Sequence, residues 1–458
     1  MVNERDTIAA VATGGVISAI GILRVSGPEA VSVMDRVFRP ADGRPMSAHA
    51  DRELVYGALL DKEGETLDLC LCTVSRAPHS YTGEDTAELQ CHGSPVVLAA
   101  GLESLFARGV RQALAGEFTR RAFLNGRLDL TRAEAVIDII EARTPLAAKN
   151  AAGQLSGAVQ RSADAVYEAL RDIASHYHAV LDYPDEDIEP FALKNYENTL
   201  SAAEGALRVL LSTYERGRYL DRGVPAVIAG KPNAGKSSLL NALLGYERAI
   251  VTEIPGTTRD TLSEGCVVGG VPLRLTDTAG MRLTADTVEA LGVERARSAA
   301  EEAALLLAVF DLSRPWEAED DDVLALAEKA PKAIAVANKC DLAPAWDSGR
   351  LGPCFDAVCV LSAREGTGLS ELEKAVAELF PAPEAPAGEI LTNARQAEAI
   401  GRAAEHLHAA AEALSGGWTA DAVLTECEGA MEALAELTGR VVRADVTDAI
   451  FSRFCVGK

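Results

Sequence analysis

The spacing of apolar residues changes character near residue 121. Up to residue 120, short strand-like runs alternate with turn residues, and one stretch has helical spacing; the runs are 20–25, 69–74 and 86–91, and the helical stretch is 95–108. This mixture predicts an α+β domain over residues 1–120. From 121 to 216 the segments are long and rich in Ala, Leu and Glu, which predicts helices. A helix face there is marked by Tyr196, Leu200, Ala203, Leu207, Leu210 and Tyr214.

Residues 217–383 have a different pattern, in which buried strands alternate with helical stretches. The apolar runs are 226–229, 273–276, 305–310, 333–337 and 358–361. Such alternation predicts a doubly wound parallel sheet. After a proline-rich break, helical spacing returns over 384–458, with Ile400, Leu407 and Leu414 on one stripe. We therefore expect a multidomain fold in which an α/β domain is inserted into a discontinuous helical domain.

Composition narrows the class of protein. The chain has 458 residues, 48% of them hydrophobic, with no signal-like N-terminus and no uncharged apolar run of membrane-spanning length, so we expect a cytosolic protein. Nine cysteines without paired metal spacing indicate reduced thiols. The formal charge of −24 disfavours indiscriminate binding of nucleic acid, which needs a basic face. A nucleic-acid substrate would need a local basic patch.

A phosphate-binding loop is the clearest chemical motif. Residues 230–237 read Gly-Lys-Pro-Asn-Ala-Gly-Lys-Ser, between a predicted strand and a predicted helix. Glycines let backbone N–H groups approach phosphates. We expect Lys236 to reach the β- and γ-phosphates and Ser237 to ligate Mg²⁺. The alternative is a plain glycine turn, which this context disfavours. The candidate loop contacts are Asn233, Ala234, Gly235, Lys236, Ser237 and Ser238.

Three further motifs follow in the order of a GTPase. Asp277, Thr278, Ala279 and Gly280 end a strand, where a carboxylate and a glycine N–H can face Mg²⁺ and the γ-phosphate. Asn338, Lys339 and Asp341 follow another strand, and Asp341 can accept both donors of a guanine edge, which adenine lacks. Ser362, Ala363 and Arg364 complete the base pocket. The order predicts a GTPase, and Asp341 disfavours an ATPase.

Either GTP hydrolysis is slow in this chain, or a group other than glutamine supplies the catalytic function. Small signalling GTPases have a water-orienting Gln where this chain has Met281, which cannot polarise water. Glu289 is a candidate, with Asp286 and Glu294 as alternatives. The amide oxygen of Asn233 could bind a monovalent cation beside the phosphates, although the residues alone favour a hydrogen-bonding role within the loop.

Several peptides together resemble the MnmE (TrmE) family of tRNA-modification GTPases. The resemblance covers essentially the whole chain and rests on residues 21–27, 81–85, 116–119, 121–126, 182–187, 252–260 and the terminal Phe454-Cys455-Val456-Gly457-Lys458. It implies a tetrahydrofolate-binding and dimerising N-terminal domain, a discontinuous helical domain and a G domain that pairs across a homodimer with K⁺. It also implies that Glu289 orients the water.

The resemblance assigns ligands residue by residue. K⁺ would be held by Asn233, Thr252, Ile254 and Thr257, and Mg²⁺ by Ser237 and Thr258. The loop of Thr252, Glu253, Ile254, Pro255, Gly256, Thr257 and Thr258 would contact GTP. A folate derivative, 5,10-methylenetetrahydrofolate or its 5-formyl analogue, would contact Arg24, Glu88, Arg127 and Lys458. Arg127 stands where the family usually has Lys, and residues 12–17 lack the usual Pro-Gly-Arg turn.

The resemblance also implies a partner and a reaction. With the FAD-containing protein MnmG, the chain would add an aminomethyl or carboxymethylaminomethyl group to C5 of the wobble uridine (U34) of certain tRNAs. Cys455 would be either a nucleophile stabilised by Lys458 or a packed thiol. The rival hypothesis is a GTP/GDP switch in ribosome assembly, which has no evident use for Arg24, Glu88 and the tail.

An arginine cluster is the best local candidate for a polyanion surface. Its members are Arg108, Arg111, Arg120, Arg121, Arg127 and Arg132. Two alternatives are that these side chains bind the glutamates of folate or that they pair with the chain's own excess of acids.

Overall fold

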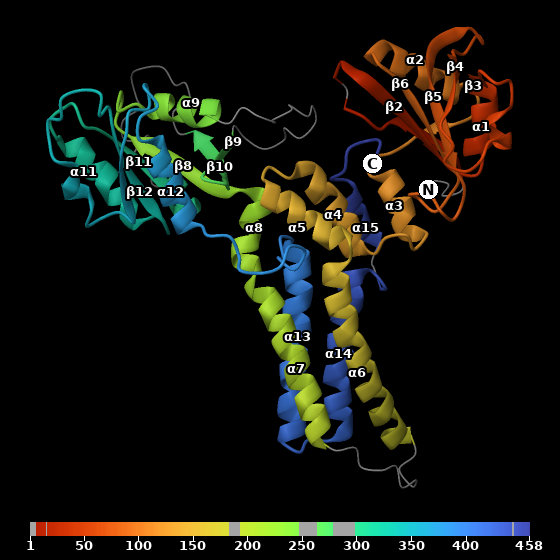
Figure 1. The fold of residues 1–458 in the computed structure, drawn as a ribbon. Helices are drawn as coiled ribbons and strands as arrows, with labels where there is room; N and C mark the ends of the chain where they lie inside the picture. Colours follow the sequence, from red (N-terminus) through yellow and green to blue (C-terminus); the bar gives the residue numbers. More distant parts are fainter. Residues whose placement is uncertain (1–5, 15, 183–192, 247–262, 278–297, 442–443) are drawn as a thin grey trace. The chain divides into compact units, whose positions relative to one another are not determined.

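The computed structural model describes residues 6–14, 16–182, 193–246, 263–277, 298–441 and 444–458 (Figure 1). The chain forms two compact units. The first unit comprises Met1–Ile137, Gln154–Ala203 and Glu405–Lys458, and the second comprises Asp138–Gly153 and Glu204–Ala404. The unit boundaries fall inside four helices: α4 (Leu130–Glu141), α5 (Pro145–Leu155), α7 (Leu193–Ser212) and α13 (Ala394–Ser415).

A seven-stranded sheet forms the N-terminal part of the first unit. Its order is β3-β4-β5-β6-β2-β1-β7, and only the β1–β7 pair is parallel. The strands are β1 (Ile8–Val11), β2 (Ser18–Ser26), β3 (Phe38–Pro40), β4 (Val55–Leu60), β5 (Thr66–Ser75), β6 (Thr86–Gly93) and β7 (Arg111–Gln112). The predicted runs lie within β2, β5 and β6, so the α+β prediction is confirmed for this part.

Two helices cover one face of this sheet because their apolar residues share its core. Met34 of α1 (Ala30–Val37) and Leu98 of α2 (Pro95–Phe106) are buried in one cluster with Leu23 and Leu89 from the strands. The predicted helix over 95–108 corresponds to α2. A short 3₁₀ turn, η1 (Met46–Ala48), precedes β4.

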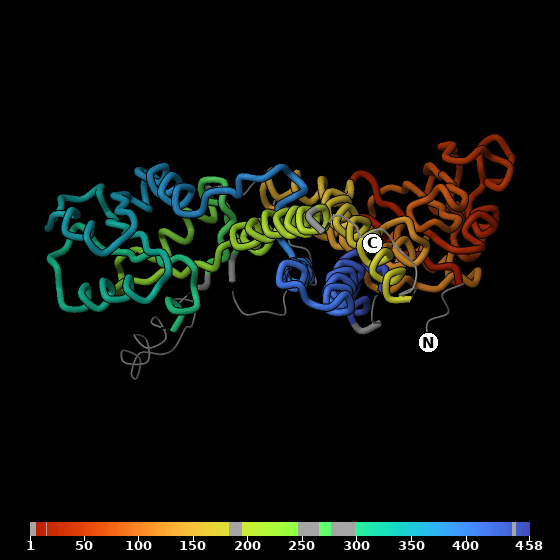
Figure 2. Tube along the Cα trace, turned by 90° about the horizontal axis from the view of Figure 1, so that it is seen from below, coloured from red at the N-terminus to blue at the C-terminus, as the bar shows by residue number. Residues whose placement is uncertain are grey.

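The rest of the first unit is helical. It includes α3 (Glu117–Leu124), α6 (Ala158–Asp182), α14 (Ala420–Thr438) and α15 (Ala444–Phe451). Helices α6 and α14 lie side by side, as both views show (Figures 1 and 2). Val159, Ala163, Val166 and Leu170 repeat at intervals of three and four along α6 and are all buried, so the apolar stripe of this helix faces its neighbours.

The predicted helix face from Tyr196 to Tyr214 is confirmed for all but its last member. Tyr196, Leu200, Ala203, Leu207 and Leu210 are buried on α7. Tyr214 does not continue that helix, because α7 ends at Ser212 and Tyr214 begins α8 (Tyr214–Arg222). Thr213 makes the break: its hydroxyl donates to the Leu210 carbonyl at 2.7 Å and accepts from the Leu391 amide at 2.9 Å.

A six-stranded sheet forms the centre of the second unit. Its order is β13-β12-β11-β8-β10-β9, and all neighbours are parallel except β9 and β10. The strands are β8 (Val224–Gly230), β9 (Ser263–Val268), β10 (Val271–Asp277), β11 (Leu305–Asp311), β12 (Ala333–Asn338) and β13 (Ala357–Val360). The five predicted strands correspond to β8, β10, β11, β12 and β13. The antiparallel edge strand β9 was not predicted.

Helices pack on both faces of this sheet, as expected for a doubly wound fold. Leu239 of α9 (Lys236–Tyr246) and Leu372 of α12 (Leu369–Leu379) share a core with one face of the strands. Val323 of α11 (Ala318–Ala325) and Leu326 of η2 (Leu326–Glu328) share a core with the other face. The 3₁₀ turn η3 (Ser348–Leu351) lies between β12 and β13. Among the described helices, none is long and apolar enough to cross a membrane.

Candidate functional site

The phosphate loop joins β8 to α9 at the carboxyl edge of the parallel strands. Ligands of open α/β sheets bind at this edge. Gly230 and Gly235 have φ values of +156° and +103°. A Cβ at Gly230 would collide with the Val309 carbonyl, and one at Gly235 would collide with the side chain of Asn338. Both positions therefore require glycine for space as well as for backbone conformation.

Asn338 ties two of the predicted motifs to each other. Its side chain is buried, with 2% exposed, at the end of β12. Nδ2 donates to the Ala234 carbonyl at 2.9 Å, and Oδ1 accepts from the Ala363 amide at 3.0 Å. One amide group thus fixes the phosphate loop against the segment predicted to complete the base pocket.

Lys339 makes a second connection to the phosphate loop. Its Nζ donates to the Asn233 carbonyl at 2.8 Å and to Asp311 Oδ2 at 2.6 Å. Burial alone would raise the pKa of Asp311, but hydrogen bonds from Lys339 and Ser313 outweigh it and lower that pKa. Asp311 is therefore a carboxylate, and its charge holds the ammonium beside the loop.

Lys236 and the serines lie at the start of α9. Lys236 Nζ donates to the carbonyls of Gly230 and Lys231 at 2.7 and 2.8 Å, so its ammonium lies over the loop. Ser237 and Ser238 are exposed in the first helical turn. The N-terminus of a helix carries partial positive charge and free N–H groups, which suit an anion.

The remaining described residues of the motif set lie near the surface. Asp341 and Arg364 are exposed, and Arg364 Nε lies 3.6 Å from Glu365. Ser362 is buried, with its N–H bonded to the Thr367 carbonyl at 2.9 Å. Asn233 has an exposed side chain and a φ of +64°, a conformation that Asn tolerates better than most residues.

Part of the predicted GTPase machinery lies outside the described residues. Asp277 ends β10, but its side chain is not among those described. The same holds for every atom of Thr252, Glu253, Ile254, Pro255, Gly256, Thr257, Thr258, Thr278, Ala279, Gly280, Met281, Asp286, Glu289 and Glu294. The described site is therefore the phosphate loop with the base-recognition segments.

Sequence reasoning missed the acidic residues that brace this loop. Lys231 Nζ pairs with Asp320 at 2.6 Å and with Glu317 at 2.9 Å, both at the start of α11. Asp311 pairs with Lys339, as described above. A signal for Asp311 existed, because it ends a buried strand and lies opposite Asn338 in the sheet register. Functional side chains at the ends of parallel strands lie together at the carboxyl edge of the sheet.

A second cluster joins the N-terminal sheet to the end of the chain. Arg24 Nε pairs with Glu88 Oε1 at 2.8 Å across β2 and β6, and Arg24 Nη1 donates to the Gly457 carbonyl at 3.4 Å. The Arg24 guanidinium also lies 5.8 Å from the ring centroids of both Tyr81 and Phe118. Three predicted ligands of folate, Arg24, Glu88 and Lys458, are thereby brought together.

Lys458 is electrostatically coupled to this pair. Burial lowers the pKa of Lys458, the positive charge of Arg24 lowers it further, and Glu88 opposes both effects. Arg127 is exposed, and its side-chain stem lies beside Gly83 in the 81–85 motif. Cys455 is exposed. In the unusual 12–17 segment, the Ala12 amide donates to the Ile22 carbonyl at 2.8 Å, and Ile17 is exposed.

Backbone contacts hold the terminal peptide against the first unit. The Phe118 amide donates to the Lys458 carbonyl at 3.2 Å, the Gly116 amide donates to the Cys455 carbonyl at 3.4 Å, and Ala115 forms an antiparallel bridge with Val456. Gly457 has a φ of +105°, and a Cβ there would collide with the Val11 carbonyl. The terminal peptide can therefore lie against Val11 only if residue 457 is glycine.

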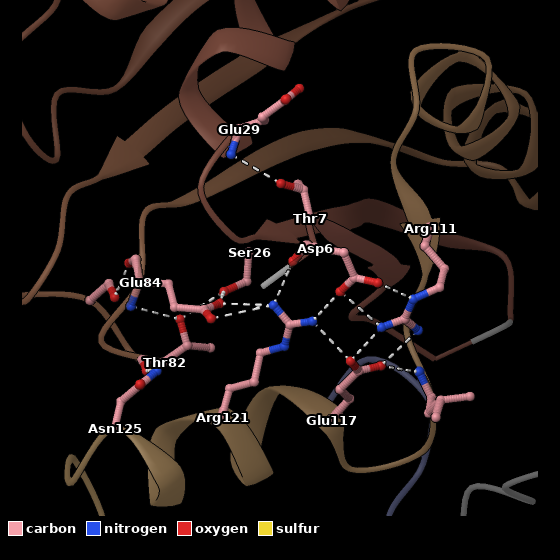
Figure 3. Close-up of polar contacts among 12 residues, drawn as sticks. Asp6, Thr7, Ser26, Glu29, Thr82, Glu84, Arg111, Glu117, Arg121 and Asn125 are labelled. Atoms are coloured by element: carbon pink, nitrogen blue, oxygen red, sulfur yellow. Dashed lines mark hydrogen bonds and ion pairs between the residues drawn. The ribbon is translucent and has the colours of Figure 1, made fainter. Parts of the chain in front are cut away.

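A partly buried charge network, with Arg121 and Glu117 at its buried centre, supports the turn against which the terminal peptide lies (Figure 3). Arg121 Nη2 pairs with Asp6 at 2.7 Å and with Glu117 at 3.0 Å, and its Nη1 pairs with Glu84 at 3.1 Å. Arg111 pairs with Asp6 and Glu117 at 2.7 and 2.6 Å. Hydrogen bonds from Arg111 are the main cause of the lowered pKa of Asp6.

The network corrects the expected polyanion surface. Arg111 and Arg121 are occupied by internal acids, and Arg120 pairs with Asp448 at 3.2 Å. Arg108 donates to the Ser104 and Asp61 carbonyls, and Arg132 donates to the Leu155 carbonyl. The alternative of pairing with the chain's own acids therefore describes Arg111, Arg120 and Arg121, and only the exposed Arg127 keeps the polyanion role open.

The chain is similar to known proteins over its whole length. A family model described as "GTP-binding protein TrmE N-terminus" matches residues 7–127, and one described as "MnmE helical domain" matches residues 130–455. The "tRNA modification GTPase MnmE" of Symbiobacterium thermophilum is 43% identical over 99% of each chain. The protein of the same name from Chloroflexus aurantiacus is 43% identical over 99% of this chain and 100% of that one.

Among solved structures, the G domain of the T. maritima FeoB iron transporter is 28% identical, with a TM-score of 0.26, over 34% of this chain and 97% of that one. The full-length relatives carry the family assignment, because identity above 40% extends across both units. The chain belongs to the MnmE family of tRNA modification GTPases.

Proposed function

We propose that this chain hydrolyses GTP to drive modification of C5 of the wobble uridine in certain tRNAs. The observation that carries the GTPase half is Asn338, whose one amide holds both the phosphate loop and the Ala363 segment. Such an arrangement supports a base pocket held at a fixed distance from a phosphate cradle. The tRNA half rests on the names of the full-length relatives.

Each described residue has a role that its position supports. Lys236, held over the loop, neutralises the β- and γ-phosphates, and the exposed Ser237 hydroxyl binds Mg²⁺ together with Thr258. Asp341 accepts the guanine N1–H and the exocyclic amine, which selects GTP over ATP. The loop with Gly230 and Gly235, together with the N-terminus of α9, fits the phosphates of a nucleoside triphosphate.

Potassium supplies positive charge beside the phosphates in this proposal. Its ligands would be Asn233, Thr252, Ile254 and Thr257, and Glu289 would orient the attacking water because Met281 cannot. The exposed Asn233 side chain is free to face a cation, since it is the Asn233 carbonyl that bonds to Lys339. Pairing of two G domains across a homodimer would complete this part of the site.

The test compares GTP hydrolysis by the full chain in KCl and NaCl of equal ionic strength. We expect hydrolysis to be on the order of 10²-fold faster in K⁺, the size of effect seen when one preorganised charge-stabilising group is removed. Asn233→Gly is the matched variant, because glycine adopts a φ of +64° without strain and removes only the amide. This variant should hydrolyse GTP equally slowly in both salts. Equal rates for the unaltered chain would contradict the role of potassium.

The second candidate site would supply the one-carbon unit. Arg24, Glu88, Lys458 and the exposed Arg127 would contact 5,10-methylenetetrahydrofolate, whose glutamate tail suits cations and whose heterocycle suits a paired donor and acceptor. The neighbouring ring of Tyr81, which is partly exposed, suits stacking with such a heterocycle. Cys455 is exposed and belongs to the same terminal peptide as Lys458, so it is a candidate nucleophile.

The partner in this proposal is the FAD-containing protein MnmG, which would act with the homodimer on tRNA. Mass spectrometry of wobble uridines from cells that lack the chain tests the modification separately from GTP hydrolysis. Loss of the aminomethyl-type group at C5 would support the proposal. An unchanged nucleoside profile would favour a GTP/GDP switch in ribosome assembly.

A further inference from the structure

A buried carboxylate, Asp311, holds the lysine that links the base-recognition segment to the phosphate loop. Asp311 ends β11 with 7% of its surface exposed. Its Oδ2 accepts from Lys339 Nζ at 2.6 Å, and its Oδ1 accepts from the Ser313 amide and hydroxyl at 3.0 and 2.6 Å. Both carboxylate oxygens are thus engaged, so its orientation is fixed.

Lys339 is held in a conformation that needs such support. Its φ is +67°, a region that a long side chain rarely adopts. Its Nζ makes two bonds, one to Asp311 and one to the Asn233 carbonyl at 2.8 Å. Without the carboxylate, a flexible lysine with 27% of its side chain exposed would have solvent-facing rotamers available.

We infer that Asp311 is a positioning residue for nucleotide binding, which acts by holding Lys339 against the Asn233 carbonyl. The base-recognition segment and the phosphate loop are then fixed relative to each other before the nucleotide arrives. A preformed site loses less conformational entropy when a ligand binds. This inference rests on the proposed function and adds a residue that touches neither base nor phosphate.

Glu317 and Asp320, the acids that pair with Lys231, differ from Asp311 in one respect. Asp320 also holds a lysine of the phosphate loop, Lys231, but that lysine has no bond to the base-recognition segment among the described contacts. Asp311 is therefore the acid whose lysine belongs to the base-recognition segment and bonds to the phosphate loop. Asp322, exposed on α11, offers a matched control of the same residue type.

The experiment measures the dissociation constant of GDP by calorimetry on the full chain. Asp311→Asn keeps the shape and removes the charge, and we expect GDP to bind about tenfold more weakly, because charge-assisted hydrogen bonds are roughly twice as strong as neutral ones. Asp322→Asn should bind GDP as the unaltered chain does. Lys339→Ala should also bind GDP weakly.

The double variant separates positioning from a general loss of stability. If Asp311 acts through Lys339, Asp311→Asn should add less than twofold weakening in the Lys339→Ala background. A full tenfold effect in that background, or no effect of Asp311→Asn in the unaltered background, would overturn the inference. Failure of the unaltered chain to bind GDP would instead overturn the proposed function, and the inference with it.

Discussion

Arg121 is the central residue of the charge network that supports the turn at 114–118, against which the terminal peptide lies. Its side chain is 5% exposed and reaches three carboxylates, Asp6, Glu84 and Glu117. Arg121→Met keeps an unbranched chain of similar length and deletes the charge. Glu117, whose side chain is 7% exposed, would retain only Arg111 as a charged partner within the described network.

The size of the effect follows from the burial of the pair. Removing one partner of a buried ion pair costs about 3–5 kcal/mol, because the other charge is left without compensation. Arg111 still contacts Asp6 and Glu117, so we expect the lower end of that range, about 3 kcal/mol. At about 1.4 kcal/mol per tenfold, this corresponds to a fall on the order of 10²-fold in protection from exchange.

Hydrogen exchange on the full chain, read by mass spectrometry, measures this loss of protection peptide by peptide. A local measurement is needed because a chain with more than one compact unit does not unfold in a single two-state step. Peptides covering β1 and residues 111–121 should lose protection, and peptides from β11 and β12 should not. The adjacent Arg120→Met is the control, since Arg120 and Asp448 are 36% and 63% exposed and such pairs contribute about 0–1 kcal/mol. Equal loss in the two variants would refute the argument from burial.

Two further outcomes are expected from the first unit. Gly457→Ala should displace the tail, because the new Cβ meets the Val11 carbonyl, and a titration with 5-formyltetrahydrofolate should show weaker binding than with Val456→Ala, whose side chain is partly exposed. The network should also be acid-sensitive. The pKa values of Asp6 and Glu117 are lowered in the folded chain, so their stabilisation is complete above the ordinary carboxyl range near 4 and is lost as pH falls through the lowered values. Exchange protection of residues 111–121 at pH 5 and pH 3, corrected for intrinsic rates, measures this, and Arg121→Met should show a smaller pH dependence.

Strong local patterns explain which elements were predicted from the sequence. The predicted strand before the phosphate loop and the predicted helix after it are confirmed, because a run of buried residues ends at a glycine motif. The strand β9 was missed although it had a signal. Gly269 and Gly270 connect β9 to β10, with φ values of +59° and +79°, and a Gly-Gly pair between two β-branched runs indicates a two-residue hairpin.

Other elements had no such local signal. β1 has four residues and β7 has two, and their pairing joins positions about a hundred residues apart. The end of α7 depends on a hydrogen bond between Thr213 and the distant Leu391, so periodicity alone carried the predicted helix too far. Contacts of this kind are tertiary, and propensity is a weak guide to them.

The same limit applied to the charged residues. The sequence indicated which cations could serve the sites, Arg24, Lys236 and Lys339, because their motifs are local. It named Glu88 only as a folate contact and did not indicate Asp311, since both acids reach their cations from other strands. For the arginine cluster the sequence left pairing with the chain's own acids as one alternative, and this is what Arg111 and Arg121 do; the pair of Arg111 with Glu117 depends on the turn at 114–118.

The acidic partners also bear on how a chain with a formal charge of −24 can bind anions. A carboxylate beside a cation reduces that cation's net attraction for a phosphate or a glutamate at long range. It also holds the cation in one rotamer, and this lowers the entropy lost when the ligand arrives. Glu88 does this for Arg24 and Asp311 does it for Lys339. For these two cations, a fixed geometry therefore replaces part of the long-range attraction, which suits small ligands that diffuse quickly and must be discriminated by shape.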